Sequence, residues 1–96
     1  MRRVYLDNAA TTALDSEVVA IMNDVMKNTF GNPSSSHFFG RKSKALIETS
    51  RMKIAKLIHA NPTEIYFTSG GTEADNMAIR GAVRDAGVTH VITSKI

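Results

Sequence analysis

The sequence contains no cysteine and no tryptophan, and it has only two prolines among its 96 residues. Without cysteine, these residues form no disulfide and provide neither a thiolate metal ligand nor a cysteine nucleophile. No hydrophobic run is long enough to predict a membrane span or a signal peptide, so we expect a cytoplasmic protein with no membrane partner. The net charge of +3 is too small to indicate nucleic-acid binding by itself.

The residues that are present describe one small globular domain at most, with 43% hydrophobic and 22% charged residues. Periodicity and capping signals predict helices at residues 16–27, capped by Asp15, at about 37–59, and at 72–86. Short apolar runs predict strands at residues 64–68 and 88–94. The order strand, helix, strand predicts an α/β fold with a parallel sheet. Because the last strand leaves an open edge, we expect these residues to belong to a longer chain.

Apolar residues recur at helical spacing in the first two predicted helices, and we expect them to be buried. In the first helix they are Val18, Met22, Val25 and Met26. In the second helix they are Leu46, Ile47, Ile54, Leu57 and Ile58.

The second predicted helix also carries half of the twelve basic residues, namely Arg41, Lys42, Lys44, Arg51, Lys53 and Lys56. Such a run is either a solvated helix face or a docking surface for an acidic partner. Nucleic acid is disfavoured because no aromatic platform or glycine-rich recognition loop accompanies the basic residues. His59 suits the negative end of the helix dipole, and it has no companions that would predict a metal site.

A turn of two hydroxyl residues and two glycines, Ser69-Gly70-Gly71-Thr72, joins the first predicted strand to the third helix. The unpaired N–H groups and the dipole of a helix N-terminus attract anions, and glycine lets a ligand approach the backbone closely. The Walker and dinucleotide-binding patterns are both absent, so the loop favours a single phosphate. The alternative is a plain turn in which Thr72 caps the helix.

Two more loops are rich in small and hydrogen-bonding side chains. Residues 7–12 include Asn8, and residues 30–37 include Asn32 and a run of three serines. Each is either an ordinary surface loop or a loop that places an amide beside a ligand.

Three segments, residues 5–12 (YLDNAATT), 30–37 (FGNPSSSH) and 67–76 (FTSGGTEADN), together resemble the N-terminal region of the NifS/IscS-type cysteine desulfurases. These are class V aminotransferase-like enzymes that use pyridoxal 5'-phosphate (PLP). The resemblance implies an N-terminal fragment of a fold-type I transferase, a mostly parallel sheet flanked by helices. Residues 1–13 would associate with the small domain, and residues 14–96 would begin the PLP-binding large domain. The two strands would then lie apart in the sheet, with later strands between them.

The resemblance also implies roles for single residues. Gly71 and Thr72 match the positions that hold the PLP phosphate, and Asn8 and Asn32 match substrate-proximal loops at the active-site mouth. The longer parent chain would convert L-cysteine to L-alanine. It would pass the sulfur, as an enzyme persulfide, to an acceptor or scaffold protein for iron–sulfur cluster or thiolation pathways. By the same resemblance the parent is a homodimer.

The family's catalytic residues have no match in these 96 residues. Its Schiff-base lysine, pyridine-pairing aspartate, ring-stacking histidine and nucleophilic cysteine are all expected beyond Ile96, and Lys95 does not match the Schiff-base lysine. We therefore expect the chain alone to be inactive. The alternatives are a selenocysteine lyase or aminotransferase of the same fold, a non-catalytic module that docks an acidic partner, and a nucleotide-phosphate binder.

Overall fold

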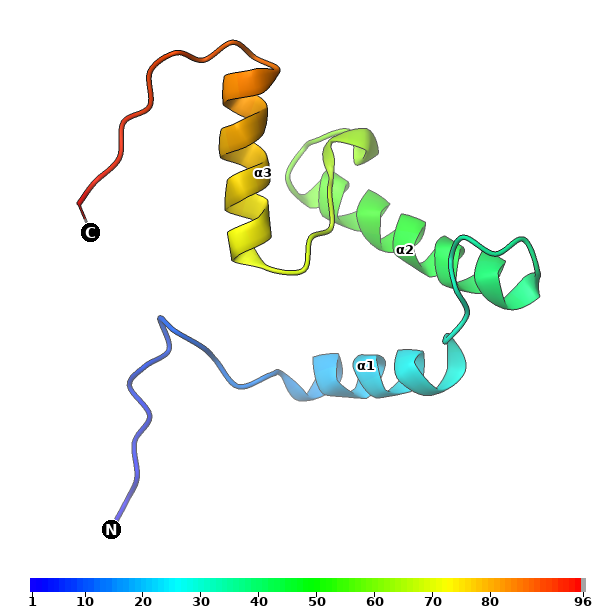
Figure 1. Ribbon diagram of the computed structural model, residues 1–96. Coiled ribbons are helices and arrows are strands. Elements are labelled where there is room, and N and C mark those ends of the chain that lie inside the picture. Colours follow the sequence, from blue (N-terminus) through cyan, green and yellow to red (C-terminus); the bar gives the residue numbers. More distant parts are fainter. Residues whose placement is uncertain (96) are drawn as a thin grey trace.

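The computed structural model describes residues 1–95 as a chain of separate helices joined by extended segments (Figure 1). The elements are α1 (Ser16–Asn28), α2 (Phe38–Leu57), a 3-10 turn η1 (Pro62–Glu64) and α3 (Gly71–Arg84). The radius of gyration is 18.3 Å, whereas a compact domain of about 100 residues has a value of about 13 Å. The helices therefore lie in an open arrangement instead of stacking into layers.

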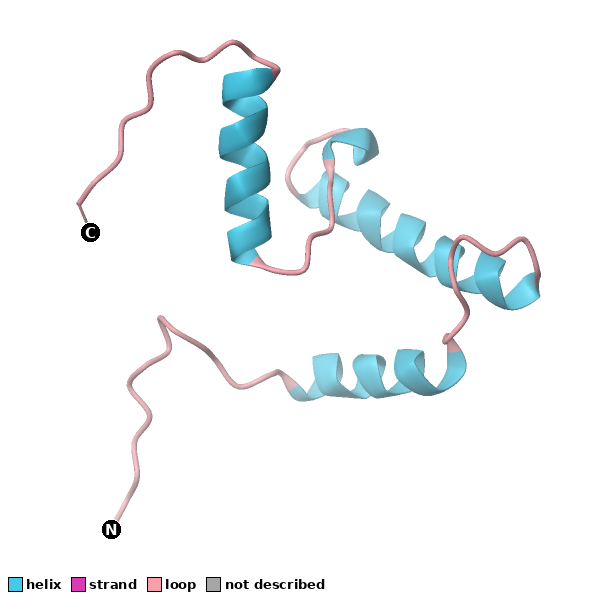
Figure 2. Cartoon of the chain, in the orientation of Figure 1, coloured by secondary structure: helices cyan, strands magenta, loops and turns pink. Residues whose placement is uncertain are grey.

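The two predicted strands are wrong for this chain, because residues 1–95 contain no strand (Figure 2). Glu64 closes η1, and Ile65 after it has extended backbone angles, φ −97° and ψ 120°. A strand also needs a neighbour that completes its ladder of backbone hydrogen bonds. Neither residues 65–68 nor residues 88–94 form such a ladder, with each other or with another described segment. The expected parallel sheet is thus absent from the part of the chain that the structure describes.

The three predicted helices are confirmed, with small changes at their ends. Asp15 caps α1 as expected, and its carboxylate accepts a hydrogen bond from the backbone N–H of Glu17 at 2.8 Å. Helix α2 ends at Leu57 with Ile58 as its C-cap, and the next residue, His59, has a left-handed backbone with φ 54°. The N–H of Ala60 then donates to the carbonyl of Ala55 at 2.9 Å, which is the Schellman ending usually made by glycine. Helix α3 begins after Gly70, so Thr72 is not its cap.

Little of the expected core is buried in this chain. The buried residues of α2 are Gly40, Ser43 and Ala55, and Ala55 is 1% exposed. Of the apolar residues of α2 that were predicted to be buried, Ile47 is half-buried. The others are exposed, namely Leu46, Ile54, Leu57 and Ile58. On α1, Val25 is half-buried and the others are exposed: Val18, Met22 and Met26. The amphipathic pattern is correct, but the burial prediction fails because the described chain places no layer over these faces.

Two local contacts hold a loop and the turn η1 against α2. The loop after α1 lies over the start of α2, where the rings of Phe30 and Phe39 stack at 5.5 Å. Gly40 has to be glycine there, because a Cβ would lie 2.2 Å from the carbonyl oxygen of Ser35. At its other end, α2 contacts η1. None of the helices in residues 1–95 is both long and apolar enough to cross a membrane.

Candidate functional site

The glycine turn meets α3 in the geometry expected of an anion site. Gly70 is extended at φ 168°, no side chain caps the helix, and Gly71 and Thr72 are its first two residues. The first intrahelical bond runs from the N–H of Ala74 to the carbonyl of Gly70, at 3.1 Å. The N–H groups of Gly71 and Thr72 therefore have no acceptor within the helix. A Cβ built on Gly70 or Gly71 would meet no atom within 4 Å, so the turn faces open space.

Ser69 is hydrogen bonded to Glu73 across the turn. Both its N–H and its hydroxyl donate to the carboxylate of Glu73, at 2.8 and 2.5 Å. Both bonds favour the charged carboxylate and lower the pKa of Glu73 below its usual range. The bond from the Ser69 hydroxyl has the larger effect, and the bond from the Ser69 N–H has the smaller one. The Ser69 hydroxyl is therefore used within the loop, and Thr72 supplies the hydroxyl that is left for a ligand. The pairing is not a capping box, because the N-cap is Gly70 and Ser69 lies four residues before Glu73.

An open hollow of about 600 Å³ lies beside this turn. Its lining consists of Ser69, Thr72, Glu73, Asn76, Met77 and Arg80. Sequence reasoning missed Asn76 and Arg80, although their four-residue spacing from Thr72 places all three on one side of α3. The Asn76 amide donates to the carbonyl of Thr72 at 2.8 Å. Arg80 adds a positive charge to the same hollow as the helix N-terminus.

The structure does not bring Asn8 or Asn32 to this hollow. Asn8 lies in a turn that is closed by the Tyr5 hydroxyl, which donates to the carbonyls of Asp7 and Thr11 at 2.9 and 3.0 Å. The side chain of Asn32 accepts a hydrogen bond from the N–H of Ser34 at 2.9 Å. The three loops lie apart in Figure 1, and within residues 1–95 no hydrogen bond joins them. Their meeting at one site stays a prediction.

The residues of the α3 N-terminus fit a monophosphate ester such as that of PLP. The two free N–H groups and the Thr72 hydroxyl are donors for phosphate oxygens. The glycines of the turn have no Cβ, which leaves room for the phosphate. A triphosphate would need a further cation within the turn itself, such as the lysine of a P-loop, and residues 69–72 contain none. The described residues contain no cluster of three or more acidic, histidine or cysteine side chains that could hold a metal ion. The turn thus offers donors and room for one phosphate group.

Comparison with known proteins identifies the family. Residues 4–95 match the model of the family described as aminotransferase class V. The chain therefore belongs to the class V aminotransferases, a family of fold-type I PLP-dependent enzymes. The resemblance found in the three sequence segments is confirmed.

Several similar proteins are cysteine desulfurases or selenocysteine lyases. The chain is 55% identical to the cysteine desulfurase IscS of Dictyoglomus turgidum, over 99% of this chain and 25% of the relative. It is 51% identical to the cysteine desulfurase IscS of Methanosarcina thermophila, over 99% of this chain and 24% of the relative. It is 49% identical to the selenocysteine lyase of Rattus norvegicus, over 86% of this chain and 19% of the relative. The chain thus spans about a quarter of the length of the desulfurases that it matches.

Proposed function

We propose that these residues are the N-terminal quarter of a PLP-dependent cysteine desulfurase, called the parent enzyme below. The parent enzyme converts L-cysteine to L-alanine and passes the sulfur to an acceptor protein as an enzyme persulfide. The observation that carries the proposal is an uncapped helix N-terminus, at Gly71 and Thr72, in a chain that is 55% identical to a desulfurase over 99% of its own residues and 25% of that enzyme.

In this proposal the chain binds and orients the cofactor. The N–H groups of Gly71 and Thr72 and the hydroxyl of Thr72 donate to the phosphate of PLP, and Arg80 adds positive charge nearby. Bound PLP supplies the electron sink that stabilises a substrate carbanion. Asn8 and Asn32 are proposed to lie near the bound cysteine once the rest of the enzyme draws their loops together.

The proposed domain division follows the family. Residues 1–13 associate with the small domain, and residues 14–96 begin the large domain. The exposed apolar faces of α1 and α2 support this division, because such faces are stable only when another layer covers them. We further propose that the parent enzyme is a cytoplasmic homodimer that serves iron–sulfur cluster assembly or thiolation.

The basic residues of α2 do not form one face, and this restricts where an acceptor could dock. At about 100° per residue, Lys42, Lys53 and Lys56 lie within about 60° of one another, whereas Arg51 is on the opposite side of the helix. Lys42 is also tied to the carbonyl of Asn28 at 2.8 Å. Lys53 and Lys56 line an open hollow with Leu57 and His59. We propose that an acidic segment of the sulfur acceptor docks at this hollow.

Selenocysteine lyase is the second candidate activity, favoured by the 49% identity to the rat enzyme. Its match covers 86% of the chain, compared with 99% for the desulfurases. A desulfurase therefore remains the better supported activity.

The test uses purified parent enzyme. We expect a visible absorbance band from bound PLP and release of alanine from L-cysteine, with sulfide appearing when a reductant is added. Selenocysteine should be tried as the competing substrate in parallel. An enzyme that carries no PLP would contradict the proposal, and one that releases alanine from selenocysteine alone would establish the second candidate.

A further inference from the structure

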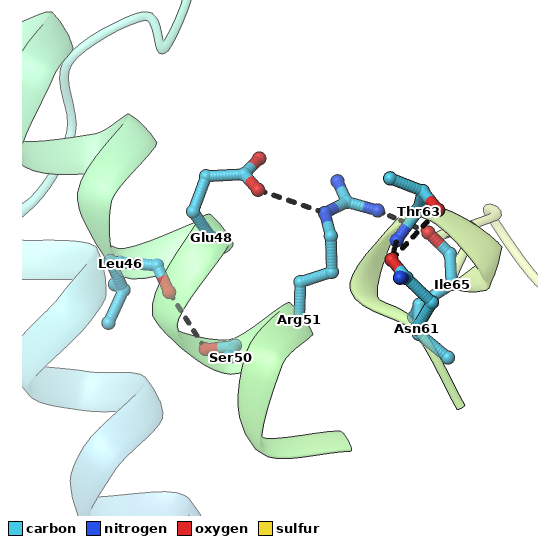
Figure 3. A network of polar contacts seen from close by, with 7 residues as sticks. All are labelled: Leu46, Glu48, Ser50, Arg51, Asn61, Thr63 and Ile65. Carbon is cyan, nitrogen blue, oxygen red and sulfur yellow. Dashed lines mark hydrogen bonds and ion pairs between the residues drawn. The ribbon is translucent and has the colours of Figure 1, made fainter. Parts of the chain in front are cut away.

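Arg51 makes three contacts at once, and they join two parts of the chain. Its Nε donates to the Glu48 carboxylate at 3.2 Å, and its Nη1 donates to the backbone carbonyl of Ile65 (Figure 3). Its guanidinium also lies over the ring of Phe67, with Cζ 5.0 Å from the ring centroid. The Arg51 side chain is 23% exposed, so it is largely packed against protein.

These contacts reach the segment that leads into the phosphate turn. Ile65 and Phe67 come just before Ser69, where the turn begins. Within residues 1–95, Arg51 is the side chain of α2 that hydrogen bonds to residues 60–70. On the other side of the turn, α3 does not pack against α2. Arg51 is therefore the polar link between the rigid helix α2 and the entrance of the turn.

A turn that contains two adjacent glycines needs such a link. Glycine has more accessible backbone conformations than any other residue, and the space that a Cβ would occupy at Gly70 and Gly71 is open, so no side-chain packing restricts them. A binding site keeps its affinity only when its donors are held within about 0.5 Å of the productive geometry. The planar guanidinium can bond a carboxylate and a carbonyl while it covers a ring, which a lysine ammonium cannot reproduce.

We propose that Arg51 is a positioning residue for the phosphate site: it fixes Ile65 and Phe67 and thereby the start of the turn at Gly70–Gly71. This inference rests on the proposed function, since the ligand is the PLP phosphate. It also removes Arg51 from the docking surface, where sequence reasoning had placed it among the basic residues of α2.

The experiment compares wild-type parent enzyme with Arg51→Leu, Arg51→Lys and the control Lys44→Leu. Lys44 lies on the same helix, about two turns before Arg51, and is exposed. Apoenzyme is titrated with PLP by fluorescence and then with inorganic phosphate as a competitor, and its melting temperature is recorded. We expect the dissociation constants for PLP and for inorganic phosphate to rise about tenfold in Arg51→Leu. Arg51→Lys should show a loss of affinity of at least threefold, and Lys44→Leu should stay within twofold of wild type.

Each result bears on the inference separately from the proposed function. If wild-type apoenzyme binds inorganic phosphate but not PLP, the proposed function fails and Arg51 is judged on phosphate affinity. If Arg51→Leu lowers only the melting temperature and leaves both affinities unchanged, Arg51 is merely structural and the inference is overturned. If Arg51→Leu does not fold, Arg51→Lys and Phe67→Leu decide, and unchanged affinities in both would overturn the inference. Wild-type enzyme that binds neither ligand would overturn both proposals.

Discussion

The carboxylate of Glu73 holds both the N–H and the hydroxyl of Ser69, at 2.8 and 2.5 Å, across the turn that opens α3. The partial positive charge at a helix N-terminus favours a carboxylate in the first turn. Glu73 thus closes the turn from inside and takes Ser69 out of the set of ligand donors. A phosphate has to bind on the other donors, the N–H groups of Gly71 and Thr72 and the Thr72 hydroxyl.

The Ser69–Glu73 contact should make the turn sensitive to acid. Because the folded-state pKa of Glu73 is lowered, the stabilisation from its charged form is present above the ordinary glutamate pKa of about 4.3. It is lost as the pH falls from there through the lower folded-state pKa. We expect the Ser69 amide resonance of the parent enzyme to shift in that range and not between pH 5 and 8. Glu73→Gln should abolish the shift, and a midpoint at or above the ordinary value would contradict the pKa direction.

Removing the hydroxyl of Thr72 should weaken cofactor retention. One hydrogen bond contributes about 1 kcal/mol, so Thr72→Ala should raise the PLP dissociation constant roughly fivefold. Thr72→Ser keeps the hydroxyl and serves as the matched control, with affinity close to wild type. Occupancy is measured by absorbance at limiting PLP. Equal occupancy in the alanine variant and the wild type would remove Thr72 from the site.

Gly40 should tolerate no side chain. Its added Cβ would lie 2.2 Å from the carbonyl oxygen of Ser35 and 2.6 Å from that of Asn32. Both are backbone atoms, so we expect Gly40→Ala to destabilise the parent enzyme by about 1–3 kcal/mol in urea unfolding. Gly81→Ala is the control, because its Cβ meets nothing closer than 4.0 Å inside α3. That change should be neutral or stabilise by up to about 1 kcal/mol. Equal effects at the two glycines would contradict the packing argument.

Charge reversal at Lys53 and Lys56 should weaken acceptor binding. Both side chains are exposed and line the hollow at the end of α2. In the double variant Lys53→Glu/Lys56→Glu, we expect weaker binding of an acidic acceptor by surface plasmon resonance, with a smaller dependence on salt than in wild type. Lys44→Glu is the control, because Lys44 lies about 180° from Lys53 around the helix. An equal loss of acceptor affinity in the double variant and in Lys44→Glu would indicate a general charge effect and would contradict a docking site at this hollow.

The helices could be predicted from the sequence because their signals are local. Asp15 caps its helix through a bond to Glu17 only two residues away, and the period of apolar residues depends on the helix alone. The strands could not be predicted in the same way. Ile65 has extended backbone angles, but a ladder requires a distant partner, which the described residues do not supply.

Only the part of the candidate site that depends on local signals could be predicted from the sequence. Gly71 and Thr72 stand at the start of α3 because glycine and hydroxyl residues mark a turn into a helix. The role of Arg51 could not be found, since a sequence shows its charge but not the carbonyl of Ile65 that it bonds 14 residues later. Asn8 and Asn32 depend on an arrangement of loops that residues 1–95 do not make by themselves.

The short reach of the contacts has a consequence for synthesis on the ribosome. The longest side-chain hydrogen bonds within residues 1–95 span 14 positions, so the helices can form within about a microsecond of emerging. A ribosome adds only about 5–20 residues per second. In a parent enzyme the apolar side chains of α1 and α3, such as Met22 and Met77, would then stay in water for many seconds. We therefore expect the nascent chain to bind chaperones at these helices until later strands cover them.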